Sequence, residues 1–346
     1  MAEVQEKIIV ISDIEMGRGD IMDDFYDDEI LASFIDQQTD KHADIPMTLV
    51  CNGDTFDFLK MSYKGKYPRS ISLEVSMWKL EEVLKTHTQV FEALKRLLEH
   101  KKHSIFFVIG NHDADLAWPE VQNRLKEFLG SRNKVSFDYE FGRPYVHIEH
   151  GQQFDPFFQI NTEKNFFQRK GKTYLKTSFG AQVCFQYLNP LKKKYPEAEQ
   201  VYPKKMIPEL FPAIKREKKK TLWKIIFKDM IIKSLMAVKD PTYTVPWKNI
   251  SKHLWRHGFD FLNDKKFLPH LLKSAQSLHE DKNIIVLGHL HVFHTSKKSG
   301  IMRYVTDTWR NEIDVTDGEK TKPKSFVEIN MFDDGGVKAD LKVYGS

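Results

Sequence analysis

Five short runs of consecutive apolar residues recur along the chain, and each run ends in a polar cluster. The runs cover residues 8–11, 47–51, 105–109, 145–148 and 284–287. Short apolar runs bounded by turn-forming residues are typical of buried strands. We therefore predict five strands, each followed by a polar loop.

Helical patterns lie between the early strands. Residues 25–38 form one such pattern, and residues 73–102 form a longer one whose apolar positions repeat at helical spacing. This alternation of strands and helices predicts an α/β core. Near the C-terminus, residues 325–331 and 337–344 flank the turn-forming sequence DDGG and predict a β-hairpin.

The stretch between the fourth and fifth predicted strands differs from the rest. Residues 155–276 contain many aromatic residues, prolines and lysines and little strand-like alternation. We interpret them as a mostly helical, basic insertion that caps a core made of residues 1–154 and 277–346. Within it, apolar residues such as Trp223 and Phe227 and lysines such as Lys220 and Lys224 recur at helical spacing.

Length and composition restrict the class of protein. The chain has 346 residues, of which 41% are hydrophobic and 29% charged, as in ordinary globular proteins. Its two cysteines exclude a disulfide framework and a four-cysteine zinc site. The first residues lack the features of a signal peptide, and no apolar run approaches the ~20 residues needed to span a bilayer. We therefore predict a cytoplasmic protein.

The net charge of +5 is unevenly distributed. Residues 13–44 carry a local net charge of −9, whereas residues 191–233 carry +8. An acidic segment favours cations and a basic segment favours anions.

The polar clusters after the predicted strands supply groups that bind metal ions. Nine of these residues stand out: Asp13, Glu15, Asp54, Asn111, His112, Asp113, His150, His289 and His291. Ligands of α/β sheets gather outside the carboxyl ends of the strands, so these side chains are expected to converge. Nitrogen and oxygen donors without thiolate suit Mn, Fe or Zn, with Mg possible. Seven candidate ligands suit two ions that share a carboxylate, an arrangement that can activate water for displacement at phosphorus.

The order and spacing of these residues resemble the motifs of the calcineurin-like metallophosphoesterases, D-x-H, GD, GNH(D/E), H and GHxH. The matching segments are Asp13-Ile14-Glu15, Gly53-Asp54, Gly110-Asn111-His112-Asp113, His150-Gly151 and Gly288-His289-Leu290-His291. The resemblance covers the core on both sides of the insertion. It implies a four-layer αββα sandwich with two mixed β-sheets, and hydrolysis of a phosphoester or pyrophosphate bond by a metal-activated water.

The resemblance also implies seven metal ligands. They are Asp13, Glu15 and His291 for the first ion, Asn111, His150 and His289 for the second, and Asp54 as the bridge. His112 would be the catalytic residue that faces the substrate, and Asp113 would orient it through a hydrogen bond.

Glu15 stands where the family has a histidine. As a ligand it would add negative charge and favour a harder ion. For the two divalent ions we therefore predict Mn, with Fe, Zn or Mg as alternatives. In the alternative interpretation, Glu15 faces away and the first ion is weakly bound or missing.

The sequence leaves the substrate open. The basic insertion is compatible with a phosphorylated small molecule, with a lipid-linked phosphate at a membrane surface, with nucleic acid, or with a purely structural cap. A likeness to the UDP-diacylglucosamine pyrophosphatases supports the lipid, although that branch reads GNRD where this chain has GNHD. No nucleic-acid-binding motif is present and no protein partner is implied. The alternative functions are a nuclease and a non-catalytic scaffold that retains the fold.

Overall fold

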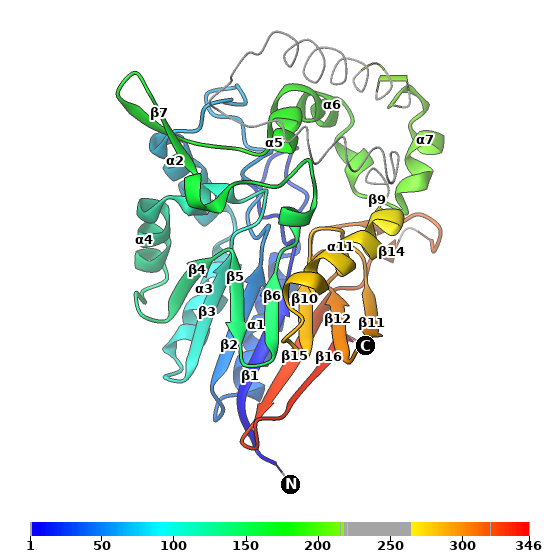
Figure 1. The fold of residues 1–346 in the computed structure, drawn as a ribbon. Coiled ribbons are helices and arrows are strands. Elements are labelled where there is room, and N and C mark those ends of the chain that lie inside the picture. The colour runs from blue at the N-terminus through cyan, green and yellow to red at the C-terminus, as the bar shows by residue number, and fades with distance from the viewer. Residues whose placement is uncertain (1, 215, 218–219, 221–263, 319, 346) are drawn as a thin grey trace.

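Two mixed β-sheets lie face to face at the centre of the protein (Figure 1). We describe the fold from a computed structural model, in which residues 2–214, 216–217, 220, 264–318 and 320–345 are described. The N-terminus lies at one end of the sheets, beside the turn between β15 and β16, and the helices α5, α6 and α7 of the insertion lie at the other end (Figure 1).

The first sheet has six strands in the order β16-β15-β1-β2-β3-β4. Its strands are β1 (Val4–Ile11), β2 (Met47–Asn52), β3 (His103–Val108), β4 (Val135–Asp138), β15 (Ser325–Phe332) and β16 (Val337–Val343). The first four are parallel to one another, whereas β15 and β16 form an antiparallel hairpin beside β1. The predicted C-terminal hairpin is confirmed.

The second sheet has five strands in the order β11-β12-β10-β6-β5. Its strands are β5 (Glu140–Arg143), β6 (Val146–Glu149), β10 (Ile284–Leu287), β11 (His294–Lys298) and β12 (Ile301–Val305). The strands β6, β10 and β12 are parallel, so the two predicted strands in this sheet end at the same edge.

Both faces of the central strands are covered, which explains their continuous apolar runs. On β1, Ile8 and Val10 face the second sheet, whereas Ile9 and Ile11 face the helices. All four side chains are fully buried, and each contributes about 1.5–3 kcal/mol of burial free energy relative to an exposed side chain.

Helices form the two outer layers. The first sheet is covered by α1 (Asp28–Lys41), α2 (Leu73–Thr86), α3 (Thr88–Glu99) and α4 (Pro119–Phe128). The second sheet is covered by α11 (Asp264–Leu278), which packs on the outer side of β10. The predicted four-layer α/β sandwich is therefore confirmed. None of the helices in the described ranges is long and apolar enough to cross a membrane.

The pattern over residues 73–102 predicts one long helix, but the structure has two, separated at His87. The backbone of His87 leaves the helical region, with φ −99° and ψ 46°. Its buried ring lies with Nδ1 2.7 Å from Asp28 Oδ1 and Nε2 3.4 Å from Asp23 Oδ2. Burial alone would lower the pKa of His87, but Asp23 and Asp28 raise that pKa to about 9.

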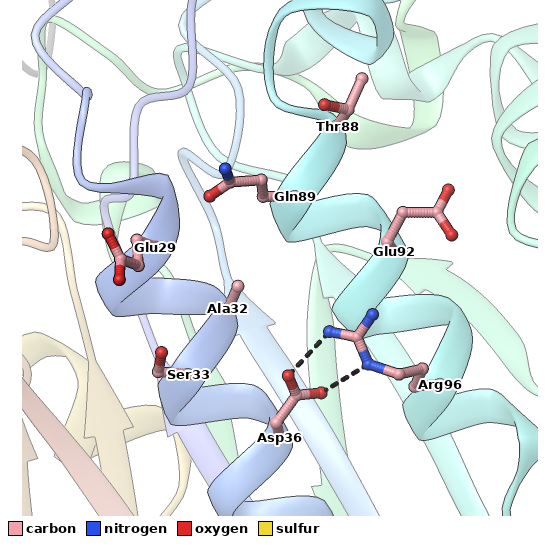
Figure 2. A pocket seen from close by; sticks show the side chains of 8 residues that line it. All are labelled: Glu29, Ala32, Ser33, Asp36, Thr88, Gln89, Glu92 and Arg96. Carbon is pink, nitrogen blue, oxygen red and sulfur yellow. Dashed lines mark hydrogen bonds and ion pairs between the residues drawn. The ribbon is translucent and has the colours of Figure 1, made fainter.

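A groove on the helical layer lies between α1 and α3 (Figure 2). It encloses about 330 Å³ and is crossed by a bidentate ion pair between Arg96 and Asp36, at 3.0 and 2.7 Å. None of the predicted site residues lines this groove.

The described part of the insertion combines short helices with strands. It includes α5 (Phe179–Val183), η4 (Cys184–Leu188), α6 (Asn189–Lys194) and α7 (Ile207–Leu210), and also a hairpin of β7 (Phe166–Arg169) and β8 (Lys172–Leu175). The left-handed backbone of Lys170 and Gly171 makes the tight turn between these strands.

A further strand, β9 (Val201–Tyr202), ties the insertion to the core. It pairs with β13 (Ile313–Asp314), which pairs in turn with β14 (Lys320–Thr321). The predicted apolar face around Trp223 and Phe227, and Lys224 of the basic stripe, lie outside the described residues. The domain boundaries stay a prediction.

Candidate metal centre

The loops that follow β1, β2, β3, β6 and β10 meet at one edge of the sandwich and bring the predicted ligands together. His291 Nε2 lies 3.1 Å from Asp13 Oδ1, and His150 Nε2 lies 3.1 Å from Asp54 Oδ2. His150 Nε2 is also 3.9 Å from Asp13 Oδ1, so the pair of His291 and Asp13 lies next to the pair of His150 and Asp54.

The second metal position combines Asp54, His150 and His289, whose ligand atoms lie within 4.8 Å of one another. The Nδ1 of His150 donates to Asn52 O (2.9 Å), and the Nε2 of His289 donates to Asp155 Oδ2 (3.1 Å). These hydrogen bonds leave the opposite ring nitrogen of each histidine as the possible ligand. Sequence reasoning missed Asp155, because it lies beyond the last residue of the matching motif.

The first metal position combines Asp13, Glu15 and His291. His291 Nε2 lies 3.1 Å from Asp13 Oδ1 and 3.4 Å from Glu15 Oε1, so both carboxylates contact the same ring nitrogen. The structure therefore disfavours the alternative in which Glu15 faces away.

Several buried atoms of the predicted ligands have no hydrogen-bond partner within the described part of the chain. They are Asp13 Oδ1, Asn111 Oδ1 and His150 Nε2. An unsatisfied buried polar atom costs about 1–3 kcal/mol, and native proteins contain few of them. Other such atoms occur elsewhere in the described residues, but these three belong to candidate ligands that lie together, so the residues fit two divalent ions.

The backbone at the centre is strained. Five of the predicted ligands have left-handed φ angles, namely Asp13 (54°), Glu15 (57°), Asp54 (49°), His289 (72°) and His291 (52°). Each costs on the order of 1–2 kcal/mol for a residue other than glycine. Backbone hydrogen bonds between the loops maintain this conformation, including Asp13 N to Gly53 O (3.1 Å) and Glu15 N to Asp54 O (2.9 Å).

Two glycines of the motifs are required by close approach. A Cβ atom on Gly110 would lie 2.1 Å from Asp54 Oδ1, and one on Gly288 would lie 2.1 Å from Ser12 Oγ and 2.8 Å from Asp13 Oδ2. Any side chain at either position would displace a ligand or its neighbour.

The predicted partner of His112 is wrong. His112 Nδ1 donates to Asp57 Oδ1 (2.9 Å), whereas Asp113 accepts from the backbone N–H groups of Gly110 (2.7 Å) and Thr55 (2.8 Å). Asp113 therefore holds two loops together and does not orient His112. The D-x-x-D spacing of Asp54 and Asp57 was the only sequence signal of this role.

The carboxylates of Asp54 and Asp57 control the ionisation of His112. Burial alone would lower the pKa of His112, but Asp54 and Asp57 raise that pKa to about 10. Burial, together with the nearby charge of Asp54, raises the pKa of Asp113 to about 7. His112 is thus the group of this pair that holds a proton most firmly.

Two buried cations adjoin the first metal position. Lys60 Nζ lies 2.8 Å from Glu15 Oε2, and Arg310 Nη1 lies 3.2 Å from the same oxygen. Burial would raise the pKa of Glu15, but Arg310 and Lys60 hold it well below its ordinary value. Arg310 lies in the loop after β12 (Ile301–Val305), and no sequence pattern marks Lys60.

A pocket of about 320 Å³ opens over the centre. Glu15, Asp54, Asn111, His112, His289 and His291 line its floor, and the insertion contributes part of its wall. The wall includes the apolar side chains of Phe158, Leu188 and Ile207 and the cationic Lys204. A bound molecule would therefore contact both the predicted ligands and the insertion.

The fold and the ligand set together indicate the class of metal-dependent phosphoesterases. The sequence matches the family described as calcineurin-like phosphoesterase over residues 6–300. The chain therefore belongs to the calcineurin-like phosphoesterase family. Among curated proteins, none matches the sequence.

Solved structures with the same fold are distant. A dimetal phosphatase from Danio rerio is 12% identical, with a TM-score of 0.41, and the match covers 99% of this chain and 100% of that one. Vacuolar Protein Sorting 29 from Cryptosporidium parvum is 11% identical, with a TM-score of 0.34, and 99% and 100% of the two chains are covered. The phosphopantetheinyl hydrolase of Mycobacterium tuberculosis is 10% identical, with a TM-score of 0.29 and coverage of 88% and 90%. Likenesses this distant carry no argument about substrate or activity.

Proposed function

We propose that this protein hydrolyses a phosphoester or pyrophosphate bond with two divalent ions bound at the centre. The observation that carries this proposal is the set of buried, unpartnered atoms on Asp13, Asn111 and His150, which surround Asp54 next to His112. The unpartnered atoms are counted within the described ranges of the chain. In such a centre the ions, when bound, polarise the phosphoryl oxygens and lower the pKa of a water molecule.

The residues around the ions have separate tasks. Asp54 bridges the two metal positions, and its Oδ1 is held by the backbone N–H of His112 (2.7 Å). The hydrogen bond from His112 Nδ1 to Asp57 leaves Nε2 to give a proton to the leaving oxygen or to stabilise charge on the phosphate. Asp57 is a positioning residue for this step.

Mixed ligands support a mid-series metal. Three of the seven predicted ligands are histidines and the others offer oxygen, a combination that suits Mn, Fe or Zn, with Mg as a poorer fit. We propose Mn as the most activating ion.

The pocket supports a substrate with a partly apolar second group. Phe158, Leu188 and Ile207 offer apolar contacts beside the centre, and Lys204 offers a positive charge. A lipid-linked or nucleotide-linked phosphate satisfies both features. We further propose that the protein is cytoplasmic and that its basic insertion contacts an anionic membrane surface; several lysines of that stretch, including Lys218, Lys219 and Lys224, lie outside the described residues.

Hydrolysis of bis-p-nitrophenyl phosphate tests the reaction class. Metal-free protein should be inactive and should gain activity with Mn, with smaller gains from Fe, Zn or Mg. A parallel panel of phosphomonoesters, nucleoside diphosphate sugars and single-stranded DNA separates a pyrophosphatase from a nuclease. Absence of turnover with every ion and substrate would instead support the scaffold.

A further inference from the structure

Glu15 departs from the family motif, and both of its oxygens accept hydrogen bonds from Arg310 Nη1, at 3.3 and 3.2 Å. Oε1 lies 3.4 Å from His291 Nε2, at the first metal position. Oε2 lies 2.8 Å from Lys60 Nζ and 3.2 Å from Arg310 Nη1. Oε1 is therefore shared between His291 and Arg310, whereas Oε2 contacts the two cations.

Both cations are buried and held by further carboxylates. The side chains of Lys60 and Arg310 are each 8% exposed. Lys60 Nζ also lies 2.9 Å from Asp24 Oδ2 and 2.7 Å from Asp57 Oδ2. Arg310 Nη2 lies 2.9 Å from Glu312 Oε1. Because buried charges are stable only when paired, these contacts fix the cations against Glu15.

We propose that Lys60 and Arg310 are positioning residues that make Glu15 a metal ligand. They hold the Glu15 carboxylate beside His291 and offset the negative charge that a carboxylate adds in place of a neutral imidazole. The first metal position then does not become more anionic than a D-x-H site, contrary to the sequence expectation that Glu15 selects a harder ion. This inference rests on the proposed function, because it requires metal binding.

The proposal reverses the expectation from the motif. Glu15→His restores the family sequence and on that basis would preserve or strengthen metal binding. In this structure, however, it would leave Lys60 and Arg310 beside a divalent cation with no anion between them. Like charges in a buried site repel strongly, so the substitution should weaken binding of the metal. Removal of Lys60 should then relieve the repulsion.

The experiment measures Mn²⁺ affinity of metal-free protein by calorimetric titration, without any substrate. The variants are Glu15→His, Glu15→His/Lys60→Met and the matched control Glu15→His/Lys79→Met. Lys79 is also fully buried and ion-paired, 3.2 Å from Asp115 Oδ1, but it lies on α2 and does not line the pocket over the centre. In the Lys60→Met variant Asp24 keeps its ion pair with Lys192, and Asp57 keeps His112.

We expect Glu15→His to weaken Mn²⁺ binding at the first position by about 10- to 100-fold, as for strongly coupled neighbours. Addition of Lys60→Met to Glu15→His should restore Mn²⁺ affinity to within about threefold of the wild type, and addition of Lys79→Met should not. The isosteric Glu15→Gln, alone and with Lys60→Met, repeats the test if the histidine variant fails to fold, which thermal unfolding in chelator reveals.

Three outcomes would overturn the proposal. Glu15→His could bind Mn²⁺ as tightly as the wild type, Lys60→Met could fail to restore binding, or Lys79→Met could restore it equally well. If the wild type itself binds no metal, the proposed function fails as well, so the two failures are distinguishable.

Discussion

The two metal positions of the centre are built differently. At the second, the candidate ligands His150 and Asn111 are an imidazole and an amide, as in the family motif. At the first, Glu15 is an anion already paired with Lys60 and Arg310. The second position therefore follows the family motif with no added charge, whereas the first departs from the motif and adds buried cations. Under the proposal above, the buried cations Lys60 and Arg310 offset the charge that Glu15 adds to the first position.

If Asp54 bridges the two ions as proposed, its substitution should have the largest effect. Asp54→Asn preserves the shape but removes the bridging charge, and we expect both ions to be lost together with activity. Metal content by mass spectrometry and turnover of the chromogenic diester measure the two losses. Retention of two ions with full activity would exclude Asp54 as the bridge.

His112→Ala should separate chemistry from metal binding. Because His112 contacts Asp57 and is not a predicted ligand, we expect both ions to be retained while activity falls about 10²- to 10⁴-fold, the usual effect of a proton donor. Metal content and turnover are measured as for Asp54→Asn. If the ions are lost to the same extent as in that variant, the role of His112 is misassigned.

Asp57→Asn should have a smaller effect and change the pH profile. Asp57 raises the pKa of His112, so its loss should lower that pKa and move the alkaline limb of kcat/KM to lower pH. We expect activity to fall about 10- to 100-fold, as for other residues that orient a catalytic group. Asp113→Asn is the control: it should reduce stability and leave the alkaline limb in place, and the opposite pattern would restore Asp113 as the partner.

The smallest effect on activity is expected at His87, in the helical layer. Its pKa is raised from 6.5 to about 9, so its contribution to stability is complete below pH 6.5 and is lost as pH rises through 9. Chemical unfolding of the wild type should show a decrease of up to about 3 kcal/mol over this range. His87→Gln should flatten that decrease without changing metal affinity; an unchanged pH dependence would contradict the assignment.

The sequence was sufficient for the five predicted strands and for the convergence of the seven candidate ligands, because each candidate follows a buried apolar run. It was insufficient where partners come from distant segments. Asp113 is adjacent to His112 in sequence, but it is drawn to the backbone of Gly110 and Thr55, and Asp57 reaches the ring from another loop. The helical periodicity continues through His87, so only the buried contact with Asp28 reveals the break.

Anomalous diffraction at the Mn absorption edge, on crystals grown with Mn²⁺, tests the central claim most directly. The account predicts two ions in each chain, one bound by Asp13, Glu15 and His291 and one by Asn111, His150 and His289, with Asp54 between them. Glu15 should keep its contacts with Lys60 and Arg310 in that structure. A centre without ions, or with one ion and Glu15 turned away from His291, would contradict it.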